Sequence, residues 1–452
     1  MPYDFDLLVI GTGPAGNVAA SECRRAGWKV ALVENRLVGG ACALRACDPK
    51  KILLAAAEGF DWVHRMRDKG LTSDDIRIDW RDLMRFKRSF TETVPKNKEE
   101  EYARAGITVL KGTAQFTGEA TVEVAGKEYS ANRILIATGS VPAPASFEGS
   151  EHLTNSDHFL DADQLPARIV FVGAGYVSFE LAHLAARAGA QVQIVDRGAA
   201  PLGKFDPDLT DHLLKASQSI GVDIRLNARI EALDKVPGGY QLHFVNDAGK
   251  HTLEADWVVH GAGRKPNVGS LEPKKAGVEL NEEGGIRVND SLQSESNPHV
   301  FAAGDAIGTF PALTPVATMH AALLTQNWLE DKKLKTDHRV IPSVAFTLPP
   351  IASVGLHEQE AKEKGLAVKV AHGSMVNWYA HRRIGDDFAA YKTLVDAQTG
   401  QVLGAHLLGH HSDELINLFA LAIRAGLTAG QMKETVYAYP THASNIRYML
   451  PA

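Results

Sequence analysis

The stretch that decides the fold is Phe5–Arg25, FDLLVIGTGPAGNVAASECRR. Its first six residues, Phe5–Ile10, form a largely apolar run, which is typical of a strand buried on both faces of a parallel sheet. A GxGxxG turn over residues 11–16 and a helical pattern through Arg25 follow. A second strand, Lys29–Val33, then ends at Glu34. Strand, glycine turn, helix, strand and acid make up the dinucleotide-binding fingerprint, so the sequence predicts an α/β fold.

Each residue type in this turn has a physical reason. Gly11 permits the tight turn, Gly13 lets the backbone approach a pyrophosphate, and Gly16 allows close packing of helix on strand. The amino end of the helix faces the phosphates, and the carboxylate of Glu34 can accept hydrogen bonds from ribose hydroxyls. A glycine turn of purely structural use is the alternative, but the surrounding strand and helix patterns favour nucleotide binding.

The same unit occurs a second time. A strand at Arg168–Val172 leads into the turn Gly173-Ala-Gly175-Tyr-Val-Ser178. A predicted helix, Phe179–Ala188, ends at Gly189, and a strand, Gln191–Val195, ends at Asp196. Gly11 and Glu34 are 23 positions apart, and so are Gly173 and Asp196. The chain is therefore predicted to hold two dinucleotides, the arrangement that passes electrons between them.

Length, charge and apolar content limit the class of protein. A chain of 452 residues is predicted to fold as about three domains. Its net charge of −6 gives no reason to bind nucleic acid or an anionic membrane surface. The apolar runs are too short to span a bilayer, and the start MPYDFDLLVIG lacks the basic and apolar regions of a signal peptide. We therefore expect a cytoplasmic protein that binds neither nucleic acid nor membrane.

Three cysteines cannot build a disulfide framework, yet Cys42 and Cys47 lie five positions apart. On a regular helix their rise alone is about 7.5 Å, whereas disulfides need Cα atoms within about 4.4–6.8 Å. A bridge would require a distorted or half-started helix, and Pro49 suits a helix start. Two buried thiols are one alternative. A zinc site with Cys23 is another, although further ligands at suitable spacing are missing.

The segment GGACALRACDPKK, residues 39–51, resembles the GGxCxxxxCxPxK signature of the flavin-dependent pyridine nucleotide–disulfide oxidoreductases, the family of glutathione reductase and lipoamide dehydrogenase. The resemblance covers the whole chain. Further segments are similar to family motifs in the same order: Thr138-Gly139, Gly263-Arg264, Gly304-Asp305, Thr314-Pro315, Ile341–Thr347 and Ser353–Gly355.

The resemblance implies two Rossmann-like dinucleotide-binding domains plus a C-terminal α+β dimerisation domain, in a homodimer. The implied boundaries are 1–147 for the FAD-binding domain with the CxxxxC motif, 148–267 for the NAD(P)-binding domain, 268–337 for the second FAD part and 338–452 for the dimer interface. The residues expected to bind FAD or NAD(P)H are Gly11, Gly13, Pro14, Ala15, Gly16, Glu34, Gly40, Ala41, Lys51, Thr138, Gly139, Gly173, Gly175, Tyr176, Asp196, Arg197, Gly263, Arg264, Gly304, Asp305, Thr314 and Pro315.

The family mechanism carries over to named positions. Electrons would pass from NADH or NADPH to the flavin and then to a redox-active disulfide, Cys42–Cys47. By resemblance Cys47 contacts the flavin and Cys42 attacks the substrate. Tyr176 resembles the tyrosine that gates the nicotinamide pocket, and Lys50 with Glu180 matches an ion pair at the flavin N5 edge. Tyr176 and Lys50 each have an alternative interpretation: Tyr176 could be a core residue, and Lys50 could be a solvated surface charge.

The chain departs from the family at the acid/base. Disulfide reductases carry HPTxxE near the C-terminus, and here Tyr439 replaces the histidine and Ser444 the glutamate. Tyrosine, with an ordinary pKa near 10, is a poor base at neutral pH. Either His442 swings into the role or the substrate needs no histidine; a lone histidine is most often a surface residue. Arg45, between the cysteines, could lower a thiol pKa or point to solvent.

Two smaller predictions concern charged groups. Asp196 favours NADH because an acid bonds the ribose 2′-hydroxyl, although Arg197 could accept a 2′-phosphate. His410 and His411, near two acids, have some metal-ligand chemistry. A capped helix start at Ser412 is the favoured interpretation.

The sequence therefore predicts an FAD-dependent oxidoreductase that uses NAD(P)H to reduce a small disulfide. A reductase of metal ions like mercuric reductase would share the missing histidine, but the chain ends without the cysteine pair that delivers the metal. A quinone or oxygen reductase that uses the cysteines as an electron store is a second alternative. A scaffold or redox sensor without activity is a third, which the intact flavin motifs disfavour.

Overall fold

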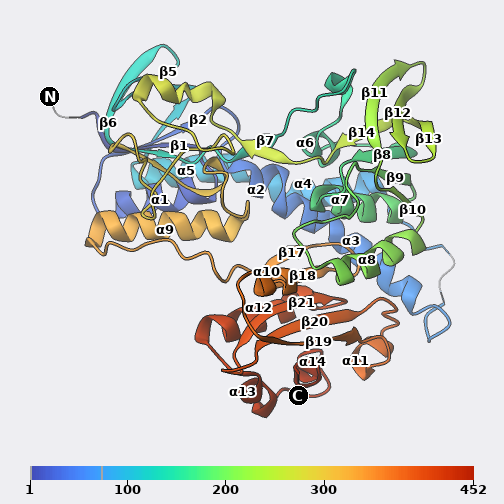
Figure 1. Cartoon of the computed structure of the whole chain (residues 1–452). Helices are drawn as coiled ribbons and strands as arrows, with labels where there is room; N and C mark the ends of the chain where they lie inside the picture. The colour runs from blue at the N-terminus through green and yellow to red at the C-terminus, as the bar shows by residue number, and fades with distance from the viewer. Residues whose placement is uncertain (1–2, 73–74, 452) are drawn as a thin grey trace. The chain divides into compact units, whose positions relative to one another are not determined.

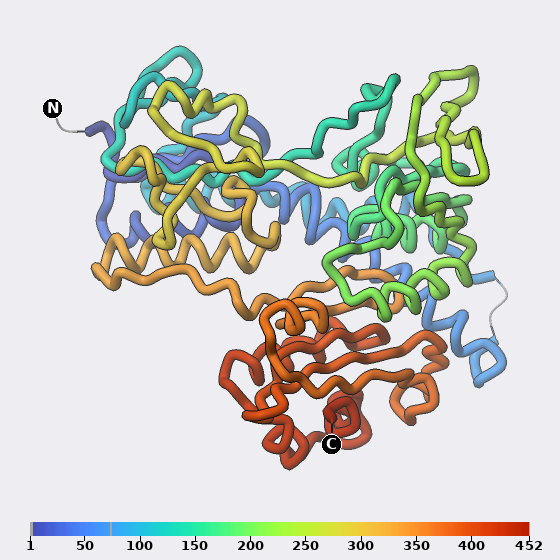
Figure 2. Tube along the Cα trace, viewed as in Figure 1, coloured from blue at the N-terminus to red at the C-terminus, as the bar shows by residue number. Residues whose placement is uncertain are grey.

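The computed structural model describes residues 3–72 and 75–451 and has the predicted α/β architecture (Figure 1). The chain forms two compact units, and it passes between them more than once, as the colours of Figure 2 allow the reader to follow. The first unit comprises Met1–Lys50, Arg85–Ala143 and Gly263–His338. The second comprises Lys51–Met84, Pro144–Ala262 and Arg339–Ala452. The predicted bounds of the four segments remain a prediction.

The first unit is built on a seven-stranded sheet in the order β3-β2-β1-β6-β5-β4, with β16 also paired to β6. Its strands are β1 (Phe5–Ile10), β2 (Val30–Glu34), β3 (Thr108–Lys111), β4 (Ala114–Gly118), β5 (Thr121–Val124), β6 (Lys127–Ile136) and β16 (Val300–Ala302). Strands β3, β2, β1, β6 and β16 run parallel. Because Leu7, Leu8 and Val9 of β1 are fully buried, the predicted strand with two covered faces is confirmed.

Helices α1 (Pro14–Arg25) and α9 (Thr314–Glu330) lie side by side in this unit (Figure 1). The predicted end of the first helix at Arg25 is confirmed. The other helices that begin here are α2 (Gly40–Arg45), α3 (Cys47–Arg65), α5 (Val94–Ala105) and the 3₁₀ turns η2 (Gly269–Leu271), η3 (Pro273–Ala276) and η4 (Gly304–Ala306). Two short strands, β7 (Ser140–Pro142) and β15 (Arg264–Pro266), pair antiparallel.

The second unit contains the repeat of the nucleotide-binding pattern. Its parallel sheet has the order β10-β9-β8-β14, with strands β8 (Arg168–Val172), β9 (Gln191–Val195), β10 (Val222–Arg225) and β14 (Trp257–His260). An antiparallel sheet follows, of β11 (Arg229–Val236), β12 (Gly239–Asn246) and β13 (Gly249–Ala255). The helices are α4 (Trp80–Thr91, shared with the first unit), η1 (Ser150–His152), α6 (Ser156–Phe159), α7 (Tyr176–Arg187) and α8 (Pro207–Ser219).

Helix α7 begins at Tyr176, three residues before the predicted start, because it continues directly from the glycine turn. The helix ends at Arg187, one residue before the predicted end, and Gly189, two residues further on, has the φ of +95° expected of a glycine that ends a helix.

The C-terminal part of this unit is the predicted α+β domain. Five antiparallel strands have the order β17-β18-β21-β20-β19. They are β17 (Ser343–Ala345), β18 (Ile351–Gly355), β19 (Val368–Ser374), β20 (Ala390–Asp396) and β21 (Val402–Leu408). The helices are α10 (Glu358–Glu363), α11 (Tyr379–Arg382), α12 (Ser412–Ala425), α13 (Ala429–Glu434), η5 (Ala443–Asn445) and α14 (Ile446–Met449). Helix α12 packs on β18 and β21 with its buried face of Leu415, Ile416 and Phe419.

Among the described residues, no helix is both long enough and apolar enough to cross a membrane.

Candidate active site

The first glycine turn has the steric features that a dinucleotide needs. Gly11 has a φ of +110°, and a Cβ there would lie 2.4 Å from the Ala137 carbonyl oxygen. A Cβ on Gly16 would lie 2.0 Å from the oxygen of Gly11, so helix and turn are in contact. Gly13, in contrast, has no atom within 4 Å of its Cβ position. The turn is therefore closed against the protein and open on the side where a pyrophosphate would approach.

The second glycine turn repeats this arrangement in the other unit. Gly173 has a φ of +96°, and a Cβ there would lie 2.6 Å from the Ala262 Cα. Ser178, which replaces the third glycine, is fully buried and packs so closely that a Cβ on Gly261 would meet its Oγ at 1.9 Å. The serine is tolerated because its neighbour is itself a glycine.

The acids that end the second strands make equivalent hydrogen bonds in the two units. Glu34 Oε2 accepts from the Thr12 amide at 3.2 Å, and Oε1 accepts from the Arg36 amide at 3.0 Å. Asp196 Oδ2 accepts from the Ala174 amide at 2.7 Å, and Oδ1 accepts from the Gly198 amide at 2.5 Å. Each carboxylate thus ties the glycine turn to the residue two positions beyond itself. Arg197, beside Asp196, is exposed.

The remaining flavin-motif residues of the first unit fit a bound FAD. Gly40 presses on the first turn, since its Cβ would lie 2.4 Å from Gly13 Cα. Thr138 Oγ1 is buried and has no hydrogen-bond partner, and Gly139 beside it has open space at its Cβ position. A buried hydroxyl without a hydrogen-bond partner, next to open space at Gly139, is expected where a polar cofactor binds.

A polar network joins two predicted flavin motifs through a residue that the sequence did not single out. Ser140 Oγ donates to Asp305 Oδ2 at 2.8 Å and accepts from Arg264 Nε at 3.0 Å. Arg264 also donates to the Ser140 carbonyl oxygen at 2.7 Å. Ser140 directly follows the Thr138-Gly139 motif, and that adjacency was the signal available in the sequence.

The other predicted cofactor residues lie at helix starts or in turns. Pro14 and Ala15 form the first turn of α1, Ala41 lies in α2, and Pro315 lies in the first turn of α9. Gly263 and Gly304 have φ angles of +105° and +65°. Gly175 lies at the N-cap of α7.

The cysteine pair lies at a break between two helices. Helix α2 ends at Arg45, Ala46 has φ −144° and ψ −98°, and α3 starts at Cys47. The predicted half-started helix is therefore confirmed. Both cysteines are free thiols, Cys42 half-buried and Cys47 exposed.

Thr314, at the start of α9, contacts both sulfurs. Its Oγ1 donates to Cys42 Sγ at 3.1 Å and lies 3.4 Å from Cys47 Sγ. The sequence resemblance placed Thr314 among the cofactor-binding residues. The structure places it at the dithiol.

The two thiols have very different pKa values. The hydrogen bond from Cys42 lowers the pKa of Cys47 to about 6, with Thr314 and the Lys50 charge contributing in the same direction and burial opposing them. The hydrogen bond to Cys47 and burial raise the pKa of Cys42. At neutral pH the reduced pair therefore holds one proton, on Cys42, beside a Cys47 thiolate. Arg45 is not among the main contributors to either shift.

Other predicted catalytic residues are placed within single units. Glu180 is buried and its Oε1 accepts from the Phe346 amide at 2.8 Å, whereas Tyr176 is 42% exposed. The alternative that Tyr176 is a core residue is therefore wrong. Lys51 pairs with Glu58 at 2.7 Å and lies over the Phe346 ring. The Lys50–Glu180 ion pair remains a prediction.

His442 is not the surface residue that its isolation in the sequence suggested. It is 6% exposed, and both ring nitrogens are buried without a hydrogen-bond partner. Burial, with the charges of His381 and His411, lowers the pKa of His442 to about 3, so the ring is neutral. Tyr439, in contrast, is 77% exposed and stacks with Tyr379.

The prediction for His410 and His411, a capped helix start at Ser412, is correct in part. Helix α12 does start at Ser412, but the N-cap is His411, and Ser412 Oγ is buried without a partner.

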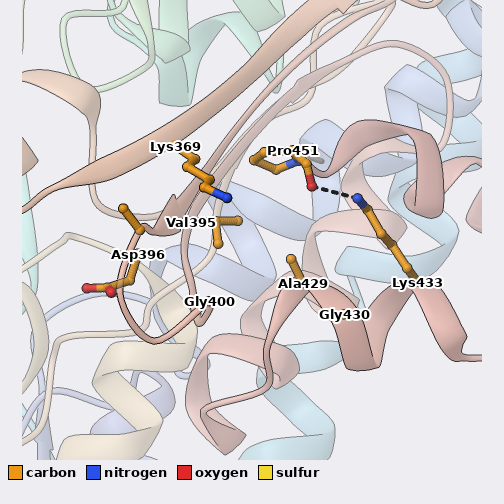
Figure 3. Close-up of a pocket in the computed structure, with 9 residues that line it drawn as sticks. Lys369, Val395, Asp396, Gly400, Ala429, Gly430, Lys433 and Pro451 are labelled. Atoms are coloured by element: carbon orange, nitrogen blue, oxygen red, sulfur yellow. Dashed lines mark hydrogen bonds between the residues drawn. The ribbon is translucent and has the colours of Figure 1, made fainter.

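A small cavity of about 220 Å³ lies in the C-terminal domain, with Lys369, Asp396 and Lys433 among its lining residues (Figure 3). Lys433 Nζ donates to the Pro451 carbonyl oxygen at 2.6 Å across it. None of the predicted site residues lines this cavity, so the glycine turn of each unit and the dithiol of the first unit remain the candidate sites.

Comparison with known proteins gives a consistent result. The family profile described as "Pyridine nucleotide-disulphide oxidoreductase" matches residues 5–321, and the profile of the dimerisation domain of the same family matches residues 341–450. A mercuric reductase from Bacillus cereus is 31% identical over 98% of this chain and 71% of its own length. A glutathione reductase from Burkholderia cepacia is 31% identical over 98% of this chain and 97% of its own.

Solved structures of flavoprotein disulfide reductases are also similar to this chain. The HOCl-induced flavoprotein disulfide reductase RclA from Escherichia coli superposes with a TM-score of 0.88 at 26% identity, covering 98% of this chain and 99% of that one. A Cu(II) complex of the same protein has a TM-score of 0.89 at 26% identity, over 99% of both chains.

Proposed function

Because the chain belongs to the pyridine nucleotide-disulphide oxidoreductase family, we propose that Cys42 and Cys47 are the pair through which it reduces a small disulfide. The protein is an NAD(P)H-dependent flavin disulfide oxidoreductase that binds FAD, and its dimerisation domain supports a homodimer. Bound FAD supplies the ring that accepts hydride from NAD(P)H and hands two electrons to the cysteines. The cytoplasmic location remains a prediction.

The observation that carries the proposal is the asymmetry of the two thiols around Thr314. Cys47 is the thiolate and Cys42 keeps the proton, while Thr314 donates a hydrogen bond to Cys42. A thiolate held next to a protonated partner is the state that a reduced redox pair needs before it meets an oxidant.

The same asymmetry supports a way to work without the missing histidine. The Cys42 proton passes along the shared hydrogen bond to Cys47, and the resulting Cys42 thiolate attacks one sulfur of the substrate. This step forms a mixed disulfide and releases one thiolate, which takes the proton from Cys47. The Cys47 thiolate then attacks Cys42 Sγ, expels the second thiolate and closes the Cys42–Cys47 disulfide. Two electrons leave the cysteines and one proton leaves with the first product.

Anaerobic titration with NADH tests the pair. The wild-type enzyme should develop a long-wavelength charge-transfer band from the Cys47 thiolate to oxidised flavin. Cys47→Ser should show no such band at any stage, whereas Cys42→Ser should show it before NADH is added and lose it as NADH reduces the flavin. Cys23→Ala, a change at a buried cysteine of α1, is the matched control and should behave as wild type. A band that survives in Cys47→Ser would contradict the assignment of Cys47.

A steady-state assay with a small aromatic disulfide as acceptor tests the reaction. Cys42→Ser should lose at least 99% of the turnover, since it removes the attacking sulfur. Turnover of a quinone that persists in Cys42→Ser, with no disulfide reduction in the wild type, would replace the proposal by a quinone reductase.

Reduction of a metal ion is the second candidate. Two observations favour it: curated relatives include mercuric reductases, and the neighbouring RclA structure is a Cu(II) complex. The enzyme would then consume NAD(P)H with Cu²⁺ or Hg²⁺ at a rate that Cys42→Ser abolishes, while small disulfides are not reduced.

For the coenzyme we propose NADH. Asp196 is the acid at the end of β9, where a 2′-phosphate would meet its charge. The ratio of kcat/KM for NADH to that for NADPH should exceed one and should fall about tenfold or more in Asp196→Asn. Arg197→Ala should leave the NADH value unchanged; a ratio below one in the wild type would reverse the assignment.

A further inference from the structure

The C-terminal domain contains a histidine cluster that the proposed reaction does not use. We define it as His381 of α11, His411 at the start of α12 and His442 before η5. The ring centroids of His381 and His442 are 4.6 Å apart, and so are those of His411 and His442. His442 therefore lies between the other two rings.

The cluster holds an unusual concentration of buried polar atoms without partners. His442 Nδ1 and Nε2 and His381 Nε2 are all buried and form no hydrogen bond. Both side chains are more than nine-tenths buried, at 6% and 0% exposure. A buried polar group without a hydrogen-bond partner destabilises the folded state. Such a group in a native structure indicates a missing polar species, such as a water or an ion.

Two neighbouring residues strengthen this point. Ser412 Oγ, next to His411 in the chain, and Asn445 Nδ2, three residues after His442, are also buried without a partner. A second protein surface could not satisfy the nitrogens of His442, because they are already covered within one chain. The species that bonds to these nitrogens must therefore be small.

The orientation of His381 favours an ion over water. Its Nδ1 lies 3.1 Å from Asp386 Oδ2, in a pair that is almost fully buried. The same oxygen of Asp386 accepts from the His410 amide at 2.9 Å and lies 3.1 Å from His410 Nδ1. Because a carboxylate oxygen only accepts hydrogen bonds, its bond to His381 uses an N–H at Nδ1, and Nε2 is the nitrogen that can serve as a ligand. A carboxylate behind a histidine whose other nitrogen is free is the arrangement that supports metal ligands.

His411 has the freedom to complete the site. It is exposed and is held at a φ of +65°, a strained conformation for a residue other than glycine. In the present conformation the ligand atoms of the three rings do not all lie within 4.8 Å of one another, so the His411 ring must turn toward the other two. The charged neighbours are Asp386 and the exposed Arg383, of opposite sign.

We propose that His381, His411 and His442 bind a divalent transition-metal ion of the kind that prefers imidazole ligands, Cu²⁺ or Zn²⁺. Three imidazoles supported by one buried carboxylate match this class of ion. The site is separate from the cysteine pair in its residues, and the ion binds without electron transfer.

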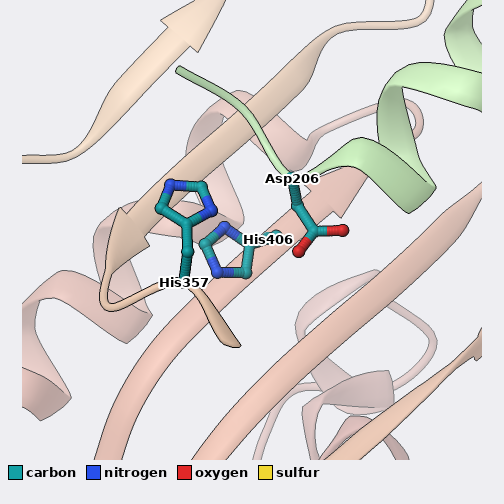
Figure 4. Close-up of side chains that lie close together, drawn as sticks. All are labelled: Asp206, His357 and His406. Carbon is teal, nitrogen blue, oxygen red and sulfur yellow. The ribbon is translucent and has the colours of Figure 1, made fainter. Parts of the chain in front are cut away.

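Another group of ligand side chains is closer together but carries no such site. Asp206, His357 and His406 have ligand atoms within 4.8 Å of one another (Figure 4). His406, however, already bonds to Ser353 Oγ at 2.7 Å and to the Leu356 carbonyl oxygen at 3.1 Å. Asp206 pairs with the ammonium of Lys392 at 3.2 Å. The ammonium of Lys392 and the hydrogen bonds of the His406 nitrogens leave no place for a metal ion in this group. His357 is therefore a suitable control residue.

The test is titration of the oxidised, FAD-loaded dimer with Cu²⁺, without NAD(P)H, followed by electron paramagnetic resonance. In this form the cysteine pair is a disulfide and offers no thiolate. We expect one Cu²⁺ per chain with the spin-echo modulation of imidazole nitrogen. His442→Ala and His411→Ala should each weaken binding at least about tenfold. His357→Ala should bind as wild type. Because His411 is exposed, its variant should fold even if the His442 variant does not.

Two outcomes would overturn the proposal. One is stoichiometric Cu²⁺ binding that is retained in His411→Ala and His442→Ala, or lost in His357→Ala. The other is no binding at a hundred-micromolar scale, which would mean that internal water satisfies the rings. Because the assay involves no turnover, either outcome leaves the proposed disulfide reduction unaffected.

Discussion

At the scale of single residues, the chemistry depends on where one proton resides between Cys42 and Cys47. The pKa of Cys47 is about 6, so its sulfur is a thiolate above that pH and becomes protonated below it. Thr314 lowers the pKa of both sulfurs through its hydroxyl. The Thr314 hydroxyl therefore helps to stabilise the Cys47 thiolate, a charged form that a nearby base would otherwise generate.

Replacing this threonine tests its role. Thr314→Val removes the hydroxyl that lies 3.4 Å from Cys47 Sγ and lowers the pKa of Cys47, so this pKa should rise by about one unit. The charge-transfer band of the reduced enzyme, followed against pH, should lose half its intensity at a correspondingly higher pH than in the wild type.

Thr318→Val is the matched control, since Thr318 is one turn along the same helix and its hydroxyl donates to the Thr314 carbonyl oxygen. Equal midpoints in Thr314→Val and Thr318→Val would show that the Thr314 hydroxyl does not hold the thiolate.

At the scale of elements, the glycine turns show how directly a local pattern predicts structure. The strands Phe5–Ile10, Arg168–Val172 and Gln191–Val195 were predicted with their observed bounds, and the second strand of the first unit lies one residue later than predicted. These predictions succeed because a buried parallel strand and a tight glycine turn depend on residues that are neighbours in the chain. The start of α7 was placed too late, because the turn residues themselves form its first turn.

The first turn should not tolerate a methyl group at its third glycine. In Gly16→Ala the new Cβ would lie 2.0 Å from the Gly11 oxygen, so the turn must open. The purified variant should have lost most of its flavin, measured as flavin absorbance per chain, and should melt at a lower temperature.

Gly59→Ala is the comparison, because Gly59 is an exposed glycine within α3 with no atom near its Cβ position. It should keep its flavin and be more stable by about 0.5–1 kcal/mol, since alanine is the better helix former. Equal flavin content in the two alanine variants would contradict the close packing at Gly16.

A second element-scale prediction concerns Lys392 of β20. Its side chain is 6% exposed and its Nζ pairs with Asp206 at 3.2 Å, Asp208 at 2.8 Å and Glu358 at 3.0 Å. The lysine thus joins the starts of α8 and α10 to the sheet. Lys392→Met would leave the buried Asp206 unpaired and should lower the free energy of unfolding by about 3 kcal/mol, measured by denaturant titration.

Lys364→Met, at the exposed end of α10, is the control and should change stability by less than about 0.5 kcal/mol. The loss in Lys392→Met should shrink as the pH falls from about 4.5 towards 2. Hydrogen bonds from Lys362 and Lys392 lower the pKa of Glu358 to about 2, and a protonated Glu358 no longer needs a counter-ion. If the loss of unfolding free energy in Lys392→Met stayed the same at low pH, it would come from altered packing and not from the unpaired carboxylates.

At the scale of the whole molecule, the family resemblance implies that the C-terminal acid/base acts on the thiol of the partner subunit in the homodimer. Tyr439 and Ser444 stand where other members have histidine and glutamate. Restoring both with Tyr439→His and Ser444→Glu should raise the rate of disulfide reduction near pH 7 about tenfold, because an imidazole can take the Cys42 proton. Tyr379→His, at an exposed tyrosine that stacks on Tyr439, is the control and should not raise it.

Mixed dimers separate the two subunits. A chain with Tyr439→His, Ser444→Glu and Cys42→Ser, paired with a wild-type chain, should show the raised rate only if the new histidine reaches the partner's cysteine. A mixed dimer no faster than half of the wild type would show that it does not.

Both nucleotide-binding turns, the cysteine pair and the missing histidine could be predicted from the amino-acid sequence, since each is a pattern of close neighbours in the chain. The tertiary structure decided three other matters. It placed Thr314 on cysteines 272 and 267 positions away, buried His442 beside His381 and His411, and joined Ser140 to Asp305 across 165 positions. The physical reason is that such contacts depend on how distant segments pack together, and the burial that lowers the pKa of His442 exists only once they have packed.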